Sequence, residues 1–150
     1  MNAAAPHALS GRLTPGGHEL TQRVYFEDTD FSGRVYHARY LHFLERGRSD
    51  YLRLLGIGHR ELGADGHAFA VRRLEIEFLR PASIDDVLTI ASRVLSVGGA
   101  RIVLAQDIGR GSDKLVEAVV TVALVGKAGR AVRLPVQIRD AFRTSATTRN

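Results

Sequence analysis

The sequence contains no cysteine. Disulfide bonds, thiolate nucleophiles and zinc sites built on cysteine are therefore excluded. A long apolar run is also missing, because the longest one, residues 118–125, is interrupted by Thr121 and is too short to span a bilayer. The first residues hold no apolar segment of the kind that a secretory signal needs. These absences favour a cytoplasmic protein.

Acidic residues are fewer than basic ones: 16 Asp and Glu stand against 21 Lys and Arg, which gives a formal net charge of +5. Such a balance favours polyanionic partners, among them nucleic acid, anionic lipid and phosphate-bearing ligands. Much of the excess lies near the C-terminus, where Phe142 is the only aromatic residue after residue 126. Stacking of bases on aromatic side chains is not expected there, and we predict no nucleic-acid partner.

The length of 150 residues predicts one domain with a single core. Residues 1–18 are rich in Ala, Pro and Gly and lack periodicity, so they read as a disordered tail in which His7 and His18 have no role. We expect the folded domain at residues 19–143 and a frayed C-terminal tail at residues 144–150.

Apolar periodicity predicts a strand at residues 20–26 and a helix at residues 35–55. The apolar positions of this helix exceed one face, which indicates burial over much of its circumference. Gly47 on the apolar stripe indicates close approach of a sheet. Later strands are expected at residues 68–79 (with a bulge near Arg72), 86–97, 101–108 and 115–125, and a short strand or helix at residues 135–142.

One long helix against a mostly antiparallel sheet of about five strands is an α+β layer architecture. Residues 115–125 are apolar on both faces, which is typical of a strand covered on both sides. A single helix covers only one face of a sheet. A second subunit is the simplest cover for the other, so we predict an oligomer.

The residues that carry chemistry lie in one stretch, residues 25–48, with the sequence YFEDTDFSGRVYHARYLHFLERGR. A carboxylate, a glycine and a helix N-terminus follow one another closely here. The N–H groups of a first helical turn are unpaired and carry the positive end of the helix dipole, which suits a developing oxyanion. Asp30 precedes them and is placed to act as general base or nucleophile. The residues alone therefore point to a hydrolase.

Two other readings of the acidic loop remain open at this stage. Residues 28–33 match the opening of an EF-hand loop, but the twelfth position is Arg39 where calcium requires a bidentate Glu. Alternatively, Asp28 and Asp30 are solvated turn residues and His37 caps the helix.

A metal site would have to use His37, His42 and Glu45. The two histidines are five positions apart, which places them ~140° from each other around a helix, so they do not chelate one ion easily. His42 and Glu45 face the same way, but a pair with this spacing is common by chance. We therefore predict no metal.

Residues 24–57 (VYFEDTDFSGRVYHARYLHFLERGRSDYLRLLGI) resemble the signature of the 4-hydroxybenzoyl-CoA thioesterase-like hotdog family. The similarity is closest to the acyl-CoA thioesterases associated with the Tol-Pal system, and residues 68–90 (AFAVRRLEIEFLRPASIDDVLTI) also resemble that group. The resemblance implies a hotdog fold: a long central helix wrapped by a curved antiparallel sheet, dimerised into a continuous sheet. It also implies hydrolysis of acyl-CoA thioesters to free acid and CoA, without a cofactor.

Carried over residue by residue, the resemblance places the catalytic carboxylate on Asp30. The backbone N–H that polarises the thioester carbonyl falls at His37, whose side chain is expected to orient substrate or water. Gly33 falls where the loop bends close to substrate, and Ser32 and Tyr36 are the other expected substrate-binding residues.

Three positions depart from the typical pattern of that family. Ser32 stands where a second glycine is usual, Arg34 replaces an apolar residue, and Arg39 replaces an Asn. These changes predict a reshaped pocket rim. Asp28 is expected to shape the loop, and Glu45 to be a structural or rim residue.

The same resemblance suggests the partners. Acyl-CoA is the expected substrate, and acyl carrier protein is a second possible carrier. Arg72, Arg73 and the C-terminal arginines are candidates for binding the CoA phosphates. A homodimer or a homotetramer built as a dimer of dimers is expected, either free in the cytoplasm or peripheral to the inner membrane. The alternative function is a non-catalytic hotdog module that docks acyl carrier protein or a cell-envelope complex.

Overall fold

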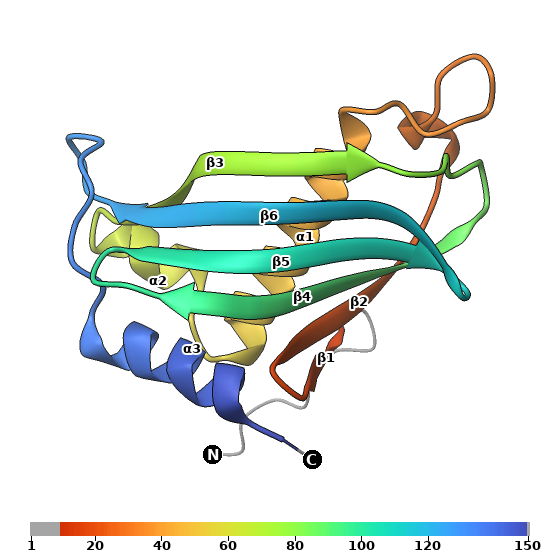
Figure 1. Cartoon of the computed structure of the whole chain (residues 1–150). Helices are drawn as coiled ribbons and strands as arrows, with labels where there is room; N and C mark the ends of the chain where they lie inside the picture. Colours follow the sequence, from red (N-terminus) through yellow and green to blue (C-terminus); the bar gives the residue numbers. More distant parts are fainter. Residues whose placement is uncertain (1–9, 150) are drawn as a thin grey trace, which may run out of the picture.

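The computed structural model describes residues 10–149. A six-stranded antiparallel sheet with the order β1-β2-β4-β5-β6-β3 packs against the long helix α1 (Figure 1). The elements are β1 (Arg12–Thr14), β2 (Gly17–Arg23), the 3-10 helix η1 (Phe26–Asp28), α1 (Arg39–Leu54), α2 (His59–Ala64), β3 (Ala68–Phe78), β4 (Val87–Val97), β5 (Arg101–Arg110), β6 (Asp113–Val125) and α3 (Val136–Thr147). The predicted α+β class and hotdog arrangement are confirmed.

The sheet has six strands because the expected N-terminal tail forms a hairpin. β1 pairs with β2, and β2 pairs with β4 along its whole length. Gly17 permits this pairing, since a Cβ there would lie only 1.9 Å from the carbonyl oxygen of Ser92. The prediction of disorder up to residue 18 is therefore wrong from residue 12 onward. Residues 1–9, including His7, lie outside the described part of the chain.

His18, which is expected from the sequence to have no role, is fully buried. Its Nε2 lies 2.7 Å from Asp50 Oδ2 of α1, and its ring stacks on Tyr51 at 5.3 Å. Burial lowers the pKa of His18, and the Asp50 carboxylate opposes this shift. The N-terminal hairpin is thus joined to the central helix by a buried polar contact.

The C-terminal prediction also requires a correction. Residues 136–147 form a helix, so the expected fraying from residue 144 onward is wrong up to residue 147. Ser145 is buried, and its Oγ shares a hydrogen bond with the hydroxyl of Tyr51. Phe142 packs edge-on against the same ring at 5.7 Å.

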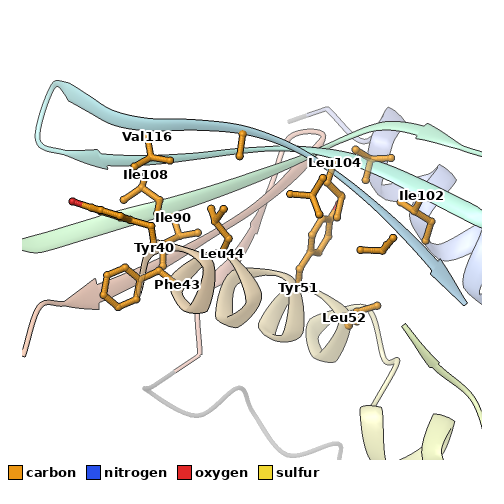
Figure 2. Close-up of a cluster of buried hydrophobic side chains, with 14 of the residues drawn as sticks. Tyr40, Phe43, Leu44, Tyr51, Leu52, Ile90, Ile102, Leu104, Ile108 and Val116 are labelled. Carbon is orange, nitrogen blue, oxygen red and sulfur yellow. The ribbon is translucent and has the colours of Figure 1, made fainter. Parts of the chain in front are cut away.

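The core lies between α1 and the inner face of the sheet, as Figure 2 shows. Gly47 allows the two layers to meet, because a Cβ there would lie 2.8 Å from Ile90 Cγ2; the predicted close approach is confirmed. The opposite face of α1, with His42 and Glu45, is exposed. The expected burial over much of the helix circumference therefore holds for the side toward the sheet and not for this outer side in the single chain.

The strands after α1 follow the predicted alternation, including the bulge between Val71 and Arg73 and the hairpin at residues 98–99. The first strand ends at Arg23 rather than residue 26, and Phe26 is 81% exposed in η1. On β6 the outward Val119 is 38% exposed, so cover on both faces is also wrong for the single chain. No helix within residues 10–149 is long and apolar enough to cross a membrane.

Candidate active site

The segment between β2 and α1 folds back on itself; we call residues 26–38 the site loop. An isolated bridge pairs Thr29 with Val35, and the N–H of Asp30 donates to the carbonyl of Arg34 at 2.9 Å. Nearer the helix, the N–H of Tyr36 donates to the carbonyl of Asp28 at 3.1 Å. The two arms of the loop are therefore held side by side.

A second set of bonds ties the loop to the segment before β4. Arg34 forms a bridge with Ser83, and the N–H of Val35 donates to the carbonyl of Ala82 at 2.9 Å. The hydroxyl of Tyr40 accepts from the N–H of Ala82 at 2.9 Å. Because residues 34–35 are held in these pairings and Tyr36 pairs with Asp28, α1 begins at Arg39 and not at the predicted residue 35.

Gly33 makes the turn at the tip of the loop. Its φ of +80° lies in the left-handed region that side chains disfavour. Its N–H donates to the carbonyl of Asp30 at 3.0 Å, and its own carbonyl accepts from the N–H of Ile84 at 3.0 Å. The predicted bend is confirmed, and a Cβ at this position would meet no atom of the described chain within 4 Å.

The Asp30 carboxylate is exposed and is held by one neighbour. Its Oδ1 accepts from the N–H of Ser32 at 2.8 Å and from the Ser32 hydroxyl. These two bonds, the hydroxyl first, lower the pKa of Asp30, and the charge of Arg34 adds to the effect. Its Oδ2 has no hydrogen-bond partner among residues 10–149. The group is therefore ionised at neutral pH and has one oxygen free for a substrate or water.

His37 lies on the other arm, two residues before α1. Neither its N–H nor that of Ala38 has a hydrogen-bond partner in the described chain, and Ala38 provides no side-chain cap. The His37 ring is exposed, 4.6 Å from the Tyr36 ring and 6.3 Å from Phe78. The start of α1 thus presents unpaired donors at the positive end of its dipole.

Asp28 differs from Asp30 in being buried. Its Oδ2 accepts from the N–H of Tyr25 at 2.9 Å, and its Oδ1 lies 3.4 Å from Arg39 Nε. Arg39 also donates to the carbonyl of Glu27 at 3.1 Å. Asp28 therefore shapes the loop as expected, and Arg39, the departure from the family pattern, clamps it.

The structure thus brings the predicted residues together in two groups. Asp30, Ser32 and Gly33 form one, and Tyr36 and His37 form the other. No hydrogen bond joins the Asp30 carboxylate to His37 within the part of the chain that the structure describes. Within the same residues, no group of three His, Asp or Glu side chains is placed to hold a metal ion.

An apolar groove runs beside α1, between this helix and strands β3 and β6. Its near pocket, of about 240 Å³, begins at Leu41 in the first turn of α1. Its far pocket, of about 200 Å³, extends past Leu52 toward α2. Arg48 lines both pockets. Sequence reasoning missed this residue, although the polar Gln106 that binds it, on the inward apolar phase of β5, was a usable signal.

Comparisons with known proteins agree with this architecture. The sequence profile of the thioesterase superfamily matches residues 32–117. The protein named acyl-CoA thioesterase YbgC of Haemophilus influenzae is 42% identical over 133 residues, which cover 87% of this chain and 97% of that protein. The Escherichia coli protein named acyl-CoA thioester hydrolase YbgC is 41% identical over 104 residues, covering 69% and 78%.

A solved structure is also close. The crystal structure of a probable thioesterase from Bartonella henselae superposes with a TM-score of 0.77 at 47% identity, covering 79% of this chain and 99% of that one. The profile match spans more than half of the chain and includes Ser32, Gly33, Tyr36 and His37. The resemblance inferred from the loop and helix motif is confirmed, and the chain belongs to the thioesterase superfamily.

Proposed function

We propose that the protein hydrolyses acyl-CoA thioesters to the free acid and CoA, with Asp30 as nucleophile or general base. The observation that carries the proposal is the pairing of two features on one loop. One is an ionised carboxylate with a free oxygen, and the other is an unpaired N–H at the start of α1. Membership of the thioesterase superfamily, with relatives named acyl-CoA thioesterase, supports this reading.

The chemistry then follows from charge development at the thioester carbonyl. As a nucleophile approaches, the carbonyl oxygen becomes negative, and the His37 N–H donates to it with help from the helix dipole. Asp30 either removes a proton from water, which attacks the carbonyl carbon, or attacks the carbon itself to give an anhydride that water then hydrolyses. In both routes the carbon–sulfur bond breaks, and the leaving thiolate takes up a proton.

The surrounding residues suggest how the substrate lies. Ser32 and Gly33 set the rim beside Asp30, and Tyr36 places an exposed ring beside His37. The groove along α1 starts in the first helical turn and is lined mainly by apolar side chains, which suits an acyl group. The His37 side chain is exposed and is positioned to orient substrate or water.

The basic surface is proposed to bind the phosphates of CoA, or the acidic face of an acyl carrier protein as a second carrier. Of the candidate arginines on β3, Arg72 and Arg73 are both exposed, but Arg73 lies 2.6 Å from Glu75 in an ion pair. Arg72 is therefore the better candidate on β3. We further propose that two copies associate, as a homodimer or as a dimer of dimers, in the cytoplasm.

The test is thiol release from a panel of short, long and aromatic acyl-CoAs by wild type and Asp30→Asn. Loss of the carboxylate is expected to lower kcat/KM by about 100-fold or more on every substrate that wild type cleaves. Asp140→Asn is the matched control, because Asp140 is exposed on α3, away from the site loop. Equal, non-zero rates for wild type and Asp30→Asn would exclude Asp30 as the reactive group, whereas the absence of hydrolysis by wild type would favour the non-catalytic binding module.

A further inference from the structure

Two polar residues lie in the core directly beneath the middle of α1. Ser92 of β4 and Gln106 of β5 are cross-strand neighbours, and both are buried. The Gln106 amide Nε2 donates to Ser92 Oγ at 2.9 Å and to the carbonyl of Leu44 at 3.0 Å. Gly47 leaves room for it, since a Cβ there would lie 3.4 Å from Nε2. The amide is therefore held in one orientation, with its oxygen free to accept.

That oxygen binds Arg48. The Arg48 Nη1 donates to Gln106 Oε1 at 2.9 Å, which fixes the guanidinium on the open side of α1. No carboxylate forms an ion pair with Arg48 in residues 10–149. Burial lowers the pKa of Arg48, and the charge of Glu45 partly opposes this shift. A guanidinium nevertheless stays protonated, so a partly desolvated cation with unused N–H donors remains.

The position of Arg48 in the groove gives these donors a use. The residue lines both pockets, with Leu41, Leu44, Leu74 and Val120 on the near side. Val71 lines both pockets, and the other apolar side chains of the far pocket include Leu52, Phe69, Leu104, Val122 and Phe142. Arg48 is nine residues beyond the start of α1, ~14 Å along the helix axis. It therefore lies well beyond the helix start, where the distal part of an acyl chain would lie.

Other polar atoms gather at the same place. Ser49 and His59 line the far pocket, and Ser49 Oγ lies 3.1 Å from His59 Nε2. The Glu45 carboxylate lines both pockets beside Arg48. A site that holds a cation and an anion side by side favours a neutral ligand group that can both accept and donate a hydrogen bond. It favours such a group more than a carboxylate on the ligand. A plain alkyl chain would remove water from the guanidinium without replacing its hydrogen bonds.

We propose that Arg48 is a specificity residue that accepts acyl groups carrying a hydroxyl on their distal part. The hydroxyl oxygen accepts from the guanidinium, and its hydrogen is donated to Glu45 or Ser49. Gln106 is a positioning residue, because it fixes Arg48 without reaching the groove. This inference rests on the proposed thioesterase function and names the substrate class of that site.

The test measures kcat/KM for matched pairs of substrates that differ only in a terminal hydroxyl. One pair is ω-hydroxylauroyl-CoA and lauroyl-CoA, and the others are the corresponding pairs with shorter and longer acyl chains. Wild type is expected to show the higher kcat/KM for the hydroxylated member of at least one pair. Arg48→Met is expected to lower the ratio of kcat/KM for the hydroxylated substrate to kcat/KM for the plain substrate by about tenfold or more. The reason is that a site built to hydrogen-bond a hydroxyl discriminates against substrates that lack it. Arg46→Met, on the face of α1 outside the groove, should leave the ratio unchanged.

Two further measurements keep the outcome decisive. If Arg48→Met does not fold, the same ratio of kcat/KM values is measured for Arg48→Lys, which keeps one hydrogen-bond donor for Gln106. Calorimetric binding of ω-hydroxylauric acid and lauric acid to wild type and variant is independent of catalysis. If no acyl-CoA is cleaved, the proposed function fails, while the binding ratio still decides the role of Arg48. The inference is overturned if wild type prefers the plain acyl chain to the hydroxylated one. It is also overturned if the variant has the same ratio as wild type.

Discussion

Ser32 controls the ionisation of Asp30 through a hydroxyl and an N–H that both donate to one carboxylate oxygen. These donors stabilise the charged form, so the pKa of Asp30 in the folded protein lies below its ordinary value. Ser32→Ala removes the larger contribution and raises this pKa. Because the carboxylate is the reactive form, activity disappears as the pH falls through the pKa. The acid limb of the profile of kcat/KM against pH is therefore expected to move to higher pH in the variant.

Thr29→Ala provides the control for this measurement. Its hydroxyl donates to the carbonyl of Phe26 in the same loop and does not touch Asp30. The acid limb of Thr29→Ala should therefore match that of wild type. Identical acid limbs in Ser32→Ala and wild type would mean that another group limits activity at low pH.

Individual residues were predictable where the chemistry is local. Gly33 and Asp30 belong to a short segment whose residue types indicate a turn with a free carboxylate, and the structure forms that turn. His18 was missed because its partner Asp50 is 32 positions away and no periodicity surrounds it. Its burial comes from tertiary packing, which local sequence does not encode.

At the level of elements, the contact of α1 with the sheet depends on Gly47. Gly47→Ala gains ~1 kcal/mol of helix propensity. The new methyl, however, meets Ile90 Cγ2 at 2.8 Å and Gln106 Nε2 at 3.4 Å. Overpacking of this kind typically costs about 1–3 kcal/mol, so we expect a net loss of stability in urea unfolding.

Gly63→Ala is the matched control for that substitution. Gly63 is also helical, in α2, but a Cβ there meets nothing within 4 Å among the described residues. Its unfolding midpoint should stay unchanged or rise. If Gly47→Ala is as stable as wild type, the Ile90 side chain moves aside at little cost in free energy. Close packing would then not explain why a glycine stands at position 47.

The strands after α1 were predicted well because alternation and hairpin glycines are local signals. The start of α1 was predicted four residues too early, since residues 34–35 pair with residues 82–83 and Tyr36 with Asp28, contacts that no local pattern indicates. The first hairpin was missed for a similar reason. β1 and β2 are short of apolar residues; β2 is ordered by pairing with β4, and β1 by pairing with β2.

At the scale of the whole molecule, several surfaces of residues 10–149 are uncovered in the single chain. Among them are the outer side of α1, the outward face of β6 around Val119, and the free edge of β3 at the end of the sheet (Figure 1). An open edge of this length exposes unpaired backbone groups and favours pairing with another strand. The association of two copies stays a prediction, and the β3 edge is the surface on which we expect it.

Proline substitution tests that edge without adding charge. Successive residues of an antiparallel strand point their N–H groups alternately to one neighbour and to the other. Of Glu75→Pro and Ile76→Pro, one therefore breaks the ladder to β6, whereas the other removes only an edge donor. Wild type is expected to sediment as a dimer or tetramer. The variant that keeps the higher thermal stability is expected to sediment as a smaller species, because its ladder to β6 is intact and its edge is blocked. A wild-type monomer, or an unchanged mass in that variant, would place the association surface elsewhere.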